Sequence, residues 1–322
     1  MSAAAFPARA FSGIKSLNPI WVLLIILWVW IAVKSPNFAT PDGFLAYIKR
    51  AAPLLLLAMG QFFVIVSGEF DLSVGSIVGA MVIGAAFLTD GDPANTVWVI
   101  PALLVFAMFV GLVNGLVTTK LRVPSFITTL GTMLILHGVI FLWTKGSPKG
   151  SLPENLRVLG RGQIDDVPGI GSIPYSFLAL VALGAIAIWL VRGNFGRKVL
   201  AVGDNERAAS LSGISVPRVR TMVFIISGLA AGIAGIILTG VGSLSADAGA
   251  GYEFQAITAV VLGGAVLGGG RGTIGGAIAG ALTLEALFKL INLLGVASEY
   301  QYAVQGLIII IAVSVASYRM RA

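Results

Sequence analysis

The chain has 322 residues, of which 57% are hydrophobic and only 11% are charged, against about 25% charged residues in an ordinary soluble domain. It has no cysteine and a single histidine, which excludes disulfides and thiolate chemistry, and no cluster of histidines and carboxylates has the spacing of a metal site. The net charge of +7 is expected to reflect orientation in a membrane, and it gives no reason to infer nucleic acid as a partner.

Apolar segments of about 20 residues recur along the chain, and each is long enough to cross ~30 Å of hydrocarbon. They predict an all-α, polytopic membrane protein with one transmembrane domain over residues 1–322. About ten spans are expected: 19–33, 51–68, 71–89, 95–118, 124–144, 173–191, 221–243, 254–270, 272–294 and 300–318. No small-residue cleavage site follows the first apolar segment, so we expect a retained helix behind a cytoplasmic segment 1–18, not a removed signal peptide.

The distribution of lysine and arginine predicts that both ends of the chain are cytoplasmic. With this orientation 13 of the 21 cations lie inside, 7 lie outside and Lys289 lies within a span. Lys34, Lys49 and Arg50 fall on the outside against the rule, so the start of the second span is the weak point of the prediction. The longest outside segment, residues 145–172, is expected to be an ordered external loop.

Glycine marks two unusual stretches of the chain. Five glycines near the end of the eighth span predict that residues 254–270 form a broken or partly re-entrant helix, which is stable at membrane depth only where protein or a water-filled cavity satisfies the backbone. Residues 72–85 and 272–286 share glycine spacing and a polar start. This similarity predicts two pseudo-repeat halves, as in many transporters, although packing of small residues alone produces the same pattern.

The polar segment 192–220, between the sixth and seventh spans, carries six of the 21 cations. Within it, residues 205–211 favour a short helix, with Asp204 or Asn205 as its N-terminal cap and Gly213 at its end. A structured polar loop is typical of a membrane protein that a cytoplasmic partner moves; a solvated loop that only sets orientation is the alternative. The chain contains no G-x-x-x-x-G-K-[ST] phosphate loop, so it does not bind and hydrolyse ATP by that route.

Five motifs are spread, in this order, over the part of the chain from about residue 45 to the C-terminus. They are GEFDLSVGSIVGA (68–80), NGLVTTKLRVPSFITTLGTM (114–133), FGRKVLAVGDNERAASLSGI (195–214), GYEFQAITAVVLGGAVLGGGRGTIGG (251–276) and INLLGVASEYQYAVQGLIIIIAV (291–313). Together they resemble the permease subunits of ribose-type sugar importers driven by ATP-binding cassettes. Glu69, Gln255 and Arg271 depart from the usual pattern of that family, which bears on the identity of the sugar.

The resemblance implies a permease that carries a monosaccharide or related polyol inward by alternating access, in the bacterial inner membrane. It implies a second permease as partner, either another copy or a paralogue, and a cytoplasmic ATPase subunit that holds ATP and Mg. It further implies an extracytoplasmic sugar-binding protein. We expect no cofactor in this chain and, because no nucleophile–base constellation is present, no enzymatic activity of its own.

The same resemblance identifies segment 192–220 as the cytoplasmic coupling loop, whose short helix docks into a cleft of the ATPase. Arg197, Glu206 and Arg207 would contact its rim. Leu211 and Ile214 would supply apolar anchorage. The residues assigned to this coupling are Asp204, Asn205, Glu206, Arg207, Ala208, Ala209, Leu211, Gly213 and Ile214.

Hydroxyl, amide and aromatic side chains of several spans are candidates for the substrate pathway. They are Ser73, Asn114, Ser125, Phe126, Thr128, Thr129 and Thr258, with Ser76 and Thr132 as further candidates. The alternative is structural, because serine and threonine in membrane helices often bond to carbonyls of their own helix.

Ionisable residues within the spans have two interpretations each. Glu69 and Asp71 either line a gate or cap the start of the third span, where a helix dipole favours negative charge. Glu285 and Lys289, four residues apart, are expected to form a structural intramembrane pair, the alternative being an ion-coupling site. His137 is expected to be a hydrogen-bonded core residue.

Three other functions stay open on the sequence alone. The first is a secondary transporter coupled to protons or sodium, which would use the intramembrane ionisable residues. The second is a permease of the same superfamily for branched amino acids or nucleosides. The third is a membrane scaffold that transports nothing.

Overall fold

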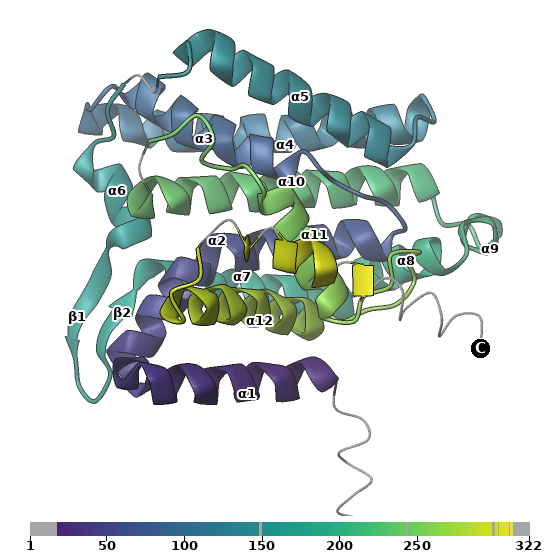
Figure 1. Cartoon of the computed structure of the whole chain (residues 1–322). Helices are drawn as coiled ribbons and strands as arrows, with labels where there is room; N and C mark the ends of the chain where they lie inside the picture. Colours follow the sequence, from purple (N-terminus) through teal and green to yellow (C-terminus); the bar gives the residue numbers. More distant parts are fainter. Residues whose placement is uncertain are drawn as a thin grey trace, which may run out of the picture.

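The fold is a bundle of helices, described here from a computed structural model (Figure 1). The structure describes residues 18–147, 150–242, 244–297, 300–301, 303–308 and 310–311. The predicted all-helical class is confirmed, with one antiparallel hairpin added. The elements are α1 (Pro19–Lys34), η2 (Pro36–Ala39), α2 (Pro41–Val66), α3 (Val74–Thr89), η3 (Pro93–Asn95), α4 (Thr96–Lys120), α5 (Ser125–Thr144), α6 (Glu154–Arg161), β1 (Gln163–Val167), β2 (Gly171–Pro174), α7 (Tyr175–Arg192), α8 (Asn194–Asp204), α9 (Glu206–Leu211), α10 (Val216–Val241), α11 (Tyr252–Leu262) and α12 (Ile274–Leu293).

Among the described residues, six helices are long and apolar enough to cross a bilayer, namely α2, α4 with the preceding η3, α5, α7, α10 and α12. The helices α1, α3 and α11 are apolar but shorter. Of the tenth predicted span, the described residues between 300 and 311 are helical, and residues 312–318 lie outside the described part of the chain. Residues 1–17 of the predicted N-terminal segment also lie outside it. The chain is therefore a multi-pass membrane protein.

The second membrane helix begins ten residues before its predicted start. Pro41 occupies the first turn of α2, where a missing N–H costs nothing, and the Thr40 hydroxyl accepts a hydrogen bond from the Gly43 N–H at 3.1 Å. Lys49 and Arg50 thus lie inside α2. Their charges lower the local hydropathy, which misplaced the boundary, whereas the proline and the cap mark the true start.

The eighth predicted span is broken, as expected. Helix α11 ends at Leu262, and the segment 263–273 that follows is irregular, with positive φ at Gly264, Gly269 and Gly270. The Gly270 N–H donates to the Val66 carbonyl at the end of α2, at 2.9 Å. Protein therefore satisfies this part of the irregular backbone at membrane depth.

The two longest helices, α2 and α10, form the centre of the bundle (Figure 1). Each has 26 residues, and they contact each other. Helix α10 also packs against α3 and α4, while α2 packs against α11 and α12. Helices α5 and α1 lie on opposite outer sides of the bundle in Figure 1.

The segment 145–172 is ordered in its described part, as expected for that loop. It forms α6, which packs against α10, and β1, which pairs with β2. The strands pair Gln163 with Pro174 and Ile164 with Ile173. In Figure 1 these elements lie at one end of the bundle, and α8 and α9 lie at the other. The two polar parts of the chain are therefore at opposite ends of the membrane helices.

Close approach of α4 and α10 depends on glycine. Gly228 of α10 lies against Gly111 and Ala107 of α4, while Gly115 lies against Thr221 and Gly232 against Ala107, so each helix presents two glycines four positions apart to its neighbour. A Cβ at Gly111 would clash with the Phe224 carbonyl. The backbones are thus in contact, which brings the buried polar residues of both helices together.

We expect Gly228→Ala to destabilise the protein, because its Cβ would clash with the Ala107 carbonyl on α4. Overpacking of this kind costs about 1–3 kcal/mol, so the thermal midpoint of unfolding in detergent should fall. Gly184→Ala in α7 is the matched control, because no described atom lies within 4 Å of the position of its Cβ. Equal midpoints for the two variants would contradict the proposed contact.

Candidate functional site

The predicted short helix in segment 192–220 is present as α9. Its N-terminal cap is Asn205, whose side-chain oxygen accepts the Ala208 N–H at 2.9 Å. Asp204, the other candidate, is the last residue of α8. The helix is closed by Gly213, whose φ is 82°, and by a bond from the Ile214 N–H to the Ala209 carbonyl at 3.1 Å. The local geometry of this element therefore follows from its cap and its glycine.

One face of α9 is exposed to its surroundings, and this face includes the apolar side chain of Leu211. Leu211 is 83% exposed, and Arg207 and Ala208 are also exposed. Ala209 is buried, and Ile214 is half-buried and packs against the hydrophobic core. Leu211, and not Ile214, is thus the apolar side chain that this element presents to its surroundings.

Helices α8 and α9 rest on the ends of membrane helices. At Gly203, the backbone of α8 is so close to the Val66 carbonyl and the Gly270 N–H that a Cβ would clash with both. The end of α8, the end of α2 and the irregular segment 263–273 therefore meet at one point.

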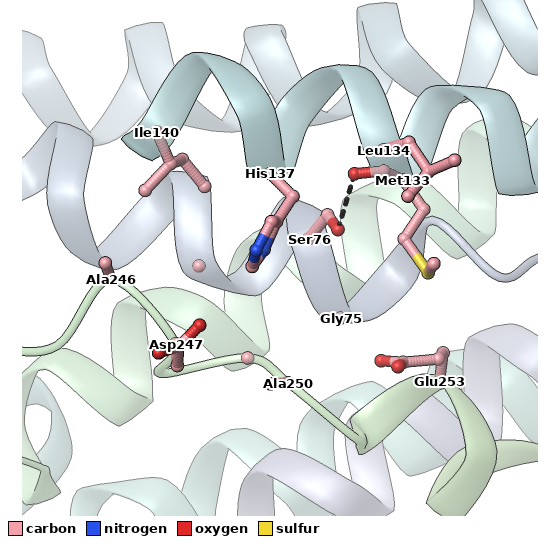
Figure 2. A pocket seen from close by; sticks show the side chains of 12 residues that line it. Gly75, Ser76, Met133, Leu134, His137, Ile140, Ala246, Asp247, Ala250 and Glu253 are labelled. Atoms are coloured by element: carbon pink, nitrogen blue, oxygen red, sulfur yellow. Dashed lines mark hydrogen bonds between the residues drawn. The ribbon is translucent and has the colours of Figure 1, made fainter. Parts of the chain in front are cut away.

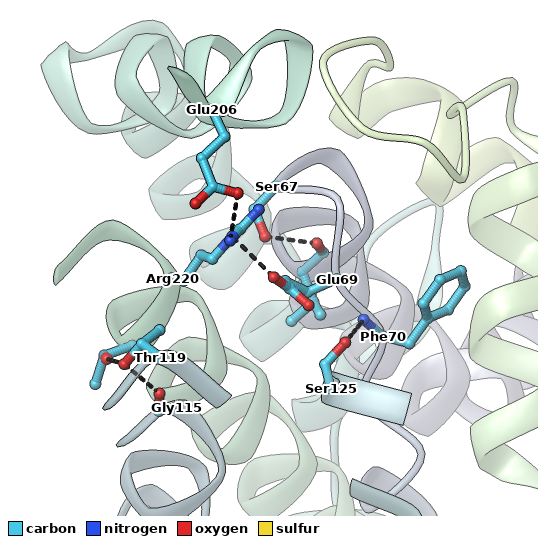
Figure 3. Close-up of polar contacts among 10 residues, drawn as sticks. Ser67, Glu69, Phe70, Gly115, Thr119, Ser125, Glu206 and Arg220 are labelled. Atoms are coloured by element: carbon cyan, nitrogen blue, oxygen red, sulfur yellow. Dashed lines mark hydrogen bonds and ion pairs between the residues drawn. The ribbon is translucent and has the colours of Figure 1, made fainter. Parts of the chain in front are cut away.

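An ion-pair cluster joins α9 to the segment between α2 and α3 (Figure 3). Arg220 of α10 lies between two carboxylates: its Nε is 2.8 Å from Oε1 of Glu69, and its Nη1 is 2.9 Å from Oε2 of Glu206. Glu69 therefore pairs with an arginine and caps no helix. The sequence analysis counted Arg220 only as a loop cation, since nothing in the sequence indicates which carboxylate it meets.

A second cluster of polar groups is centred on Asp71 and is buried except for Thr132, which is half-buried. Its Oδ1 accepts the Ser73 N–H at 3.0 Å and the Ser73 hydroxyl at 2.6 Å, and its Oδ2 accepts the Ser227 hydroxyl at 2.8 Å. The Asn114 amide donates to Ser73 Oγ at 2.9 Å, and Thr132 donates to the Asn114 carbonyl oxygen at 2.6 Å. Asp71 thus holds Ser73, the N-cap residue of α3, whose own side chain makes no capping bond, and also ties this turn to α10.

The remaining predicted pathway residues lie mainly in structural positions. Thr128, Thr129 and Thr258 are buried, and each hydroxyl donates to a carbonyl four residues earlier in the chain. Ser125 Oγ accepts the Phe70 N–H at 3.1 Å, whereas Phe126 is exposed on the outside of α5. The described linings of the two cavities below include Ser76 but none of these residues.

A cavity of about 220 Å³, the His137 cavity, lies between α3, α5 and the start of α11 (Figure 2). His137 projects into it from α5, and Asp247 and Glu253 line it from the other side. The expectation that His137 is a hydrogen-bonded core residue is wrong: the side chain is exposed, and its ring centroid lies 4.7 Å from that of Phe141. The apolar neighbours in the sequence concealed that this face of α5 is open.

A larger cavity of about 640 Å³, the polar cavity, lies between η2, α2, α11 and α12. Its lining combines charged, amide and aromatic side chains: Arg50, Glu285, Lys289, Asn37, Gln255, Asn292, Gln301, Tyr47, Tyr252, Phe38 and Phe288. The expected Glu285–Lys289 ion pair is not formed, although the structure describes both residues. Lys289 Nζ lies instead over the ring of Phe38, 5.7 Å from its centroid. Both side chains line the same cavity because both lie on α12, one turn apart.

Comparison with known proteins places this arrangement in a family. The family model described as the branched-chain amino acid transport system / permease component matches residues 43–313. The ribose import permease protein of Escherichia coli (strain K12) is 37% identical over 95% of this chain and 98% of its own length. The ribose import permease protein of Bacillus subtilis (strain 168) is 36% identical over 94% and 93%. The L-arabinose transport system permease protein of E. coli (strain K12) is 35% identical over 94% and 90%. No solved structure matches the chain.

We expect Asp71→Ala to destabilise the fold far more than loss of a buried hydroxyl elsewhere, because it leaves the hydroxyls of Ser73 and Ser227 without their buried acceptor. Each unsatisfied buried group costs about 1–3 kcal/mol. Thr258→Val is the control, since its equally buried hydroxyl donates only to Phe254 of its own helix. The thermal midpoints of both variants in detergent test this ranking, and a smaller loss for Asp71→Ala would refute it.

Proposed function

We propose that this chain, which belongs to the permease-component family matched by residues 43–313, is the membrane subunit of an ATP-binding-cassette importer for a monosaccharide or related polyol. The observation that carries the proposal is similarity over at least 90% of both chains to permeases named for ribose and L-arabinose import. The family description mentions branched-chain amino acids, but these relatives favour a sugar. None of the three is named as an ion-coupled transporter or a scaffold.

The proposed subunit lies in the bacterial inner membrane with about ten spans and with both ends in the cytoplasm. The coupling loop 192–220, with α8 and α9, then faces the cytoplasm, and the segment 145–172 faces outward. The excess of cations at the α8–α9 end supports this orientation. The location of these two segments at opposite ends of the bundle agrees with it (Figure 1).

The proposed partners act at these two faces. A cytoplasmic ATPase, which holds ATP and Mg, receives α9 in a cleft, with Leu211 as the apolar anchor and Glu206 and Arg207 at the rim. A sugar-binding protein delivers the sugar from outside, and a second permease, a copy or a paralogue, completes the membrane part. Closure of the ATPase on ATP moves α9, and with it α8, which rests on the end of α2 and on segment 263–273. In this proposal the movement of the docked ATPase drives alternating access, and this chain itself carries out no chemical reaction.

The reciprocal packing of α2 and α10 supports a construction from two related halves. In this proposal α2 corresponds to α10, α3 to α11 and α4 to α12, because α10 packs on α3 and α4 as α2 packs on α11 and α12. This alignment of elements differs from the one expected from glycine spacing, which matched the segment of α3 to that of α12. Glycines recur in both helices for packing, so their spacing is a poor guide to the repeat.

We assign sugar contact to the polar cavity. Its volume lies in the range of about 300–1,000 Å³ that is typical of small-molecule sites. Amide and charged groups such as Gln255, Asn292 and Glu285 can bond sugar hydroxyls, and the ring of Tyr252 offers apolar surface. Charged residues at membrane depth are costly and therefore generally functional. The buried hydroxyls predicted for the pathway would then keep structural roles unless the helices move.

Leu211→Glu should abolish co-purification with the ATPase and ATP-dependent uptake, because it places a charge at the proposed apolar anchor. Folding should be unaffected, since Leu211 is 83% exposed. Leu159→Glu is the control: this leucine is 37% exposed on α6, at the other end of the bundle, and its replacement should leave ATPase binding intact. Normal association of the Leu211→Glu variant would show that α9 is not the docking element.

Glu285→Gln should raise the KM for sugar uptake by about tenfold or more, because a hydrogen bond to a charged group contributes about 1.5–3 kcal/mol. Assembly with the ATPase should not change. Thr283→Val, on the same helix, is the control, since its buried hydroxyl donates only to the Ala279 carbonyl. Uptake kinetics in proteoliposomes measure the effect, and an unchanged KM would remove Glu285 from the pathway.

A further inference from the structure

We propose that Arg220 is a positioning residue that transmits movement of the docking helix α9 to α5, through Glu206 on one side and Glu69 on the other. This inference rests on the proposed function, because it assumes that an ATPase moves α9. It adds the route by which the movement reaches a helix that lines the His137 cavity.

Residues of three separate elements meet at the side chain of Arg220 (Figure 3). Glu206 is the first residue of α9, Arg220 lies near the start of α10, and Glu69 belongs to the segment between α2 and α3. A guanidinium group spreads its charge over three nitrogens, so one arginine can pair with two carboxylates at different nitrogens. Here Nε is ion-paired with Glu69 and Nη1 with Glu206 through proximity of charge and not through directed hydrogen bonds, since the buried Nε–H has no hydrogen-bond acceptor. Of the three ion pairs that the described residues form, two use Arg220.

The two ion pairs of Arg220 differ in solvent exposure: the pair with Glu69 is largely buried, and the pair with Glu206 is more exposed. The side chains of Arg220 and Glu69 are only 18% and 11% exposed, so water and salt screen their attraction little. Glu206 is 57% exposed, so solvent screens this outer contact more than the inner one. Arg220 and Glu69 therefore move as one unit, and the carboxylate of Glu206 is the point at which movement of α9 reaches this unit.

The link continues from Glu69 into α5 through the backbone of Phe70. The Phe70 N–H donates to Ser125 Oγ at 3.1 Å, and its carbonyl accepts from Thr129 Oγ1 at 3.4 Å. Both partners lie in the first turns of α5, so this segment is bonded to the helix on both sides of one residue. Further along α5, Met133 and His137 line the His137 cavity (Figure 2). Contacts thus run without a gap from the docking helix to the cavity wall.

These contacts can pull as well as push. The glycine contact at Gly203 resists compression, but close backbone contact of this kind does not hold two elements together when they separate. An ion pair attracts over several ångströms, so Arg220 follows Glu206 in either direction. Helix α9 therefore needs Arg220 for the part of the cycle in which it withdraws from the helix ends.

The test uses the complete importer, with ATPase and sugar-binding protein, in proteoliposomes. Arg220→Gln should keep ATPase association, because the Leu211 surface is intact, but should increase the ATP hydrolysed per sugar imported at least fivefold. Glu69→Gln should do the same, and the double variant should be no worse than either single one. Arg218→Gln is the matched control, since Arg218 is exposed on the same turn of α10. A merely structural role would lower the thermal midpoint and leave the ATP-to-sugar ratio unchanged.

An unchanged ratio for Arg220→Gln, or independent effects that multiply in the double variant, would overturn the inference. Should Arg220→Gln fail to fold, Glu206→Gln tests the same link, because its exposed side chain is dispensable for folding. ATPase association is measured beside it, since Glu206 is also placed at the rim of the ATPase cleft; a normal ratio with normal association is equally decisive. The two levels fail separately. If the Leu211→Glu variant still binds the ATPase, α9 is not the docking element and the premise of this inference fails, whereas a normal ratio with intact association refutes only the role of Arg220.

Discussion

The structure depends on one constraint, namely that irregular backbone inside a bilayer must find its hydrogen-bond partners within the protein. Two such segments, 67–73 and 263–273, interrupt the helical bundle, and each is satisfied by the other parts of the chain. The Gly270 N–H bonds to the carbonyl that ends α2, and the Phe70 N–H bonds to Ser125. Asp71 adds a buried acceptor that holds the turn into α3 against α10. Irregular segments that would destabilise an isolated helix thus become hydrogen-bonded joints between neighbouring helices.

These joints lie next to the polar segment 192–220, which contains α8 and α9. At Gly203 the end of α8 touches segment 263–273 and Val66, the last residue of α2 before segment 67–73, and α9 reaches segment 67–73 through Arg220. Rigid helices transmit displacement well, but a bundle of unbroken helices has few places where displacement becomes rearrangement. Broken segments provide such places, because a small shift there changes the direction of the helix that follows. The same residues thus serve stability and movement.

Sequence patterns predicted the elements whose signals are local. The cap and glycine around α9 are separated by a few residues, and the glycines after α11 mark the broken span within their own segment. The same reasoning failed where a side chain has partners from other segments. Lys289 was assigned to Glu285 by helical spacing, but it meets Phe38 of η2. His137 was placed in the core by its apolar neighbours, although it faces a cavity that three elements enclose.

The sequence by itself determined the membrane class, the approximate position of most of the helices, the short capped helix and the resemblance to sugar importers, because hydropathy, capping and motifs are read along the chain. Only the tertiary structure decided which charges meet, which hydroxyls are buried and where the cavities lie. The physical reason is that a charge in a nonpolar environment takes its partner from whichever element packs against it. For Arg220 those elements are α9 and the turn before α3, and no spacing in the sequence relates them.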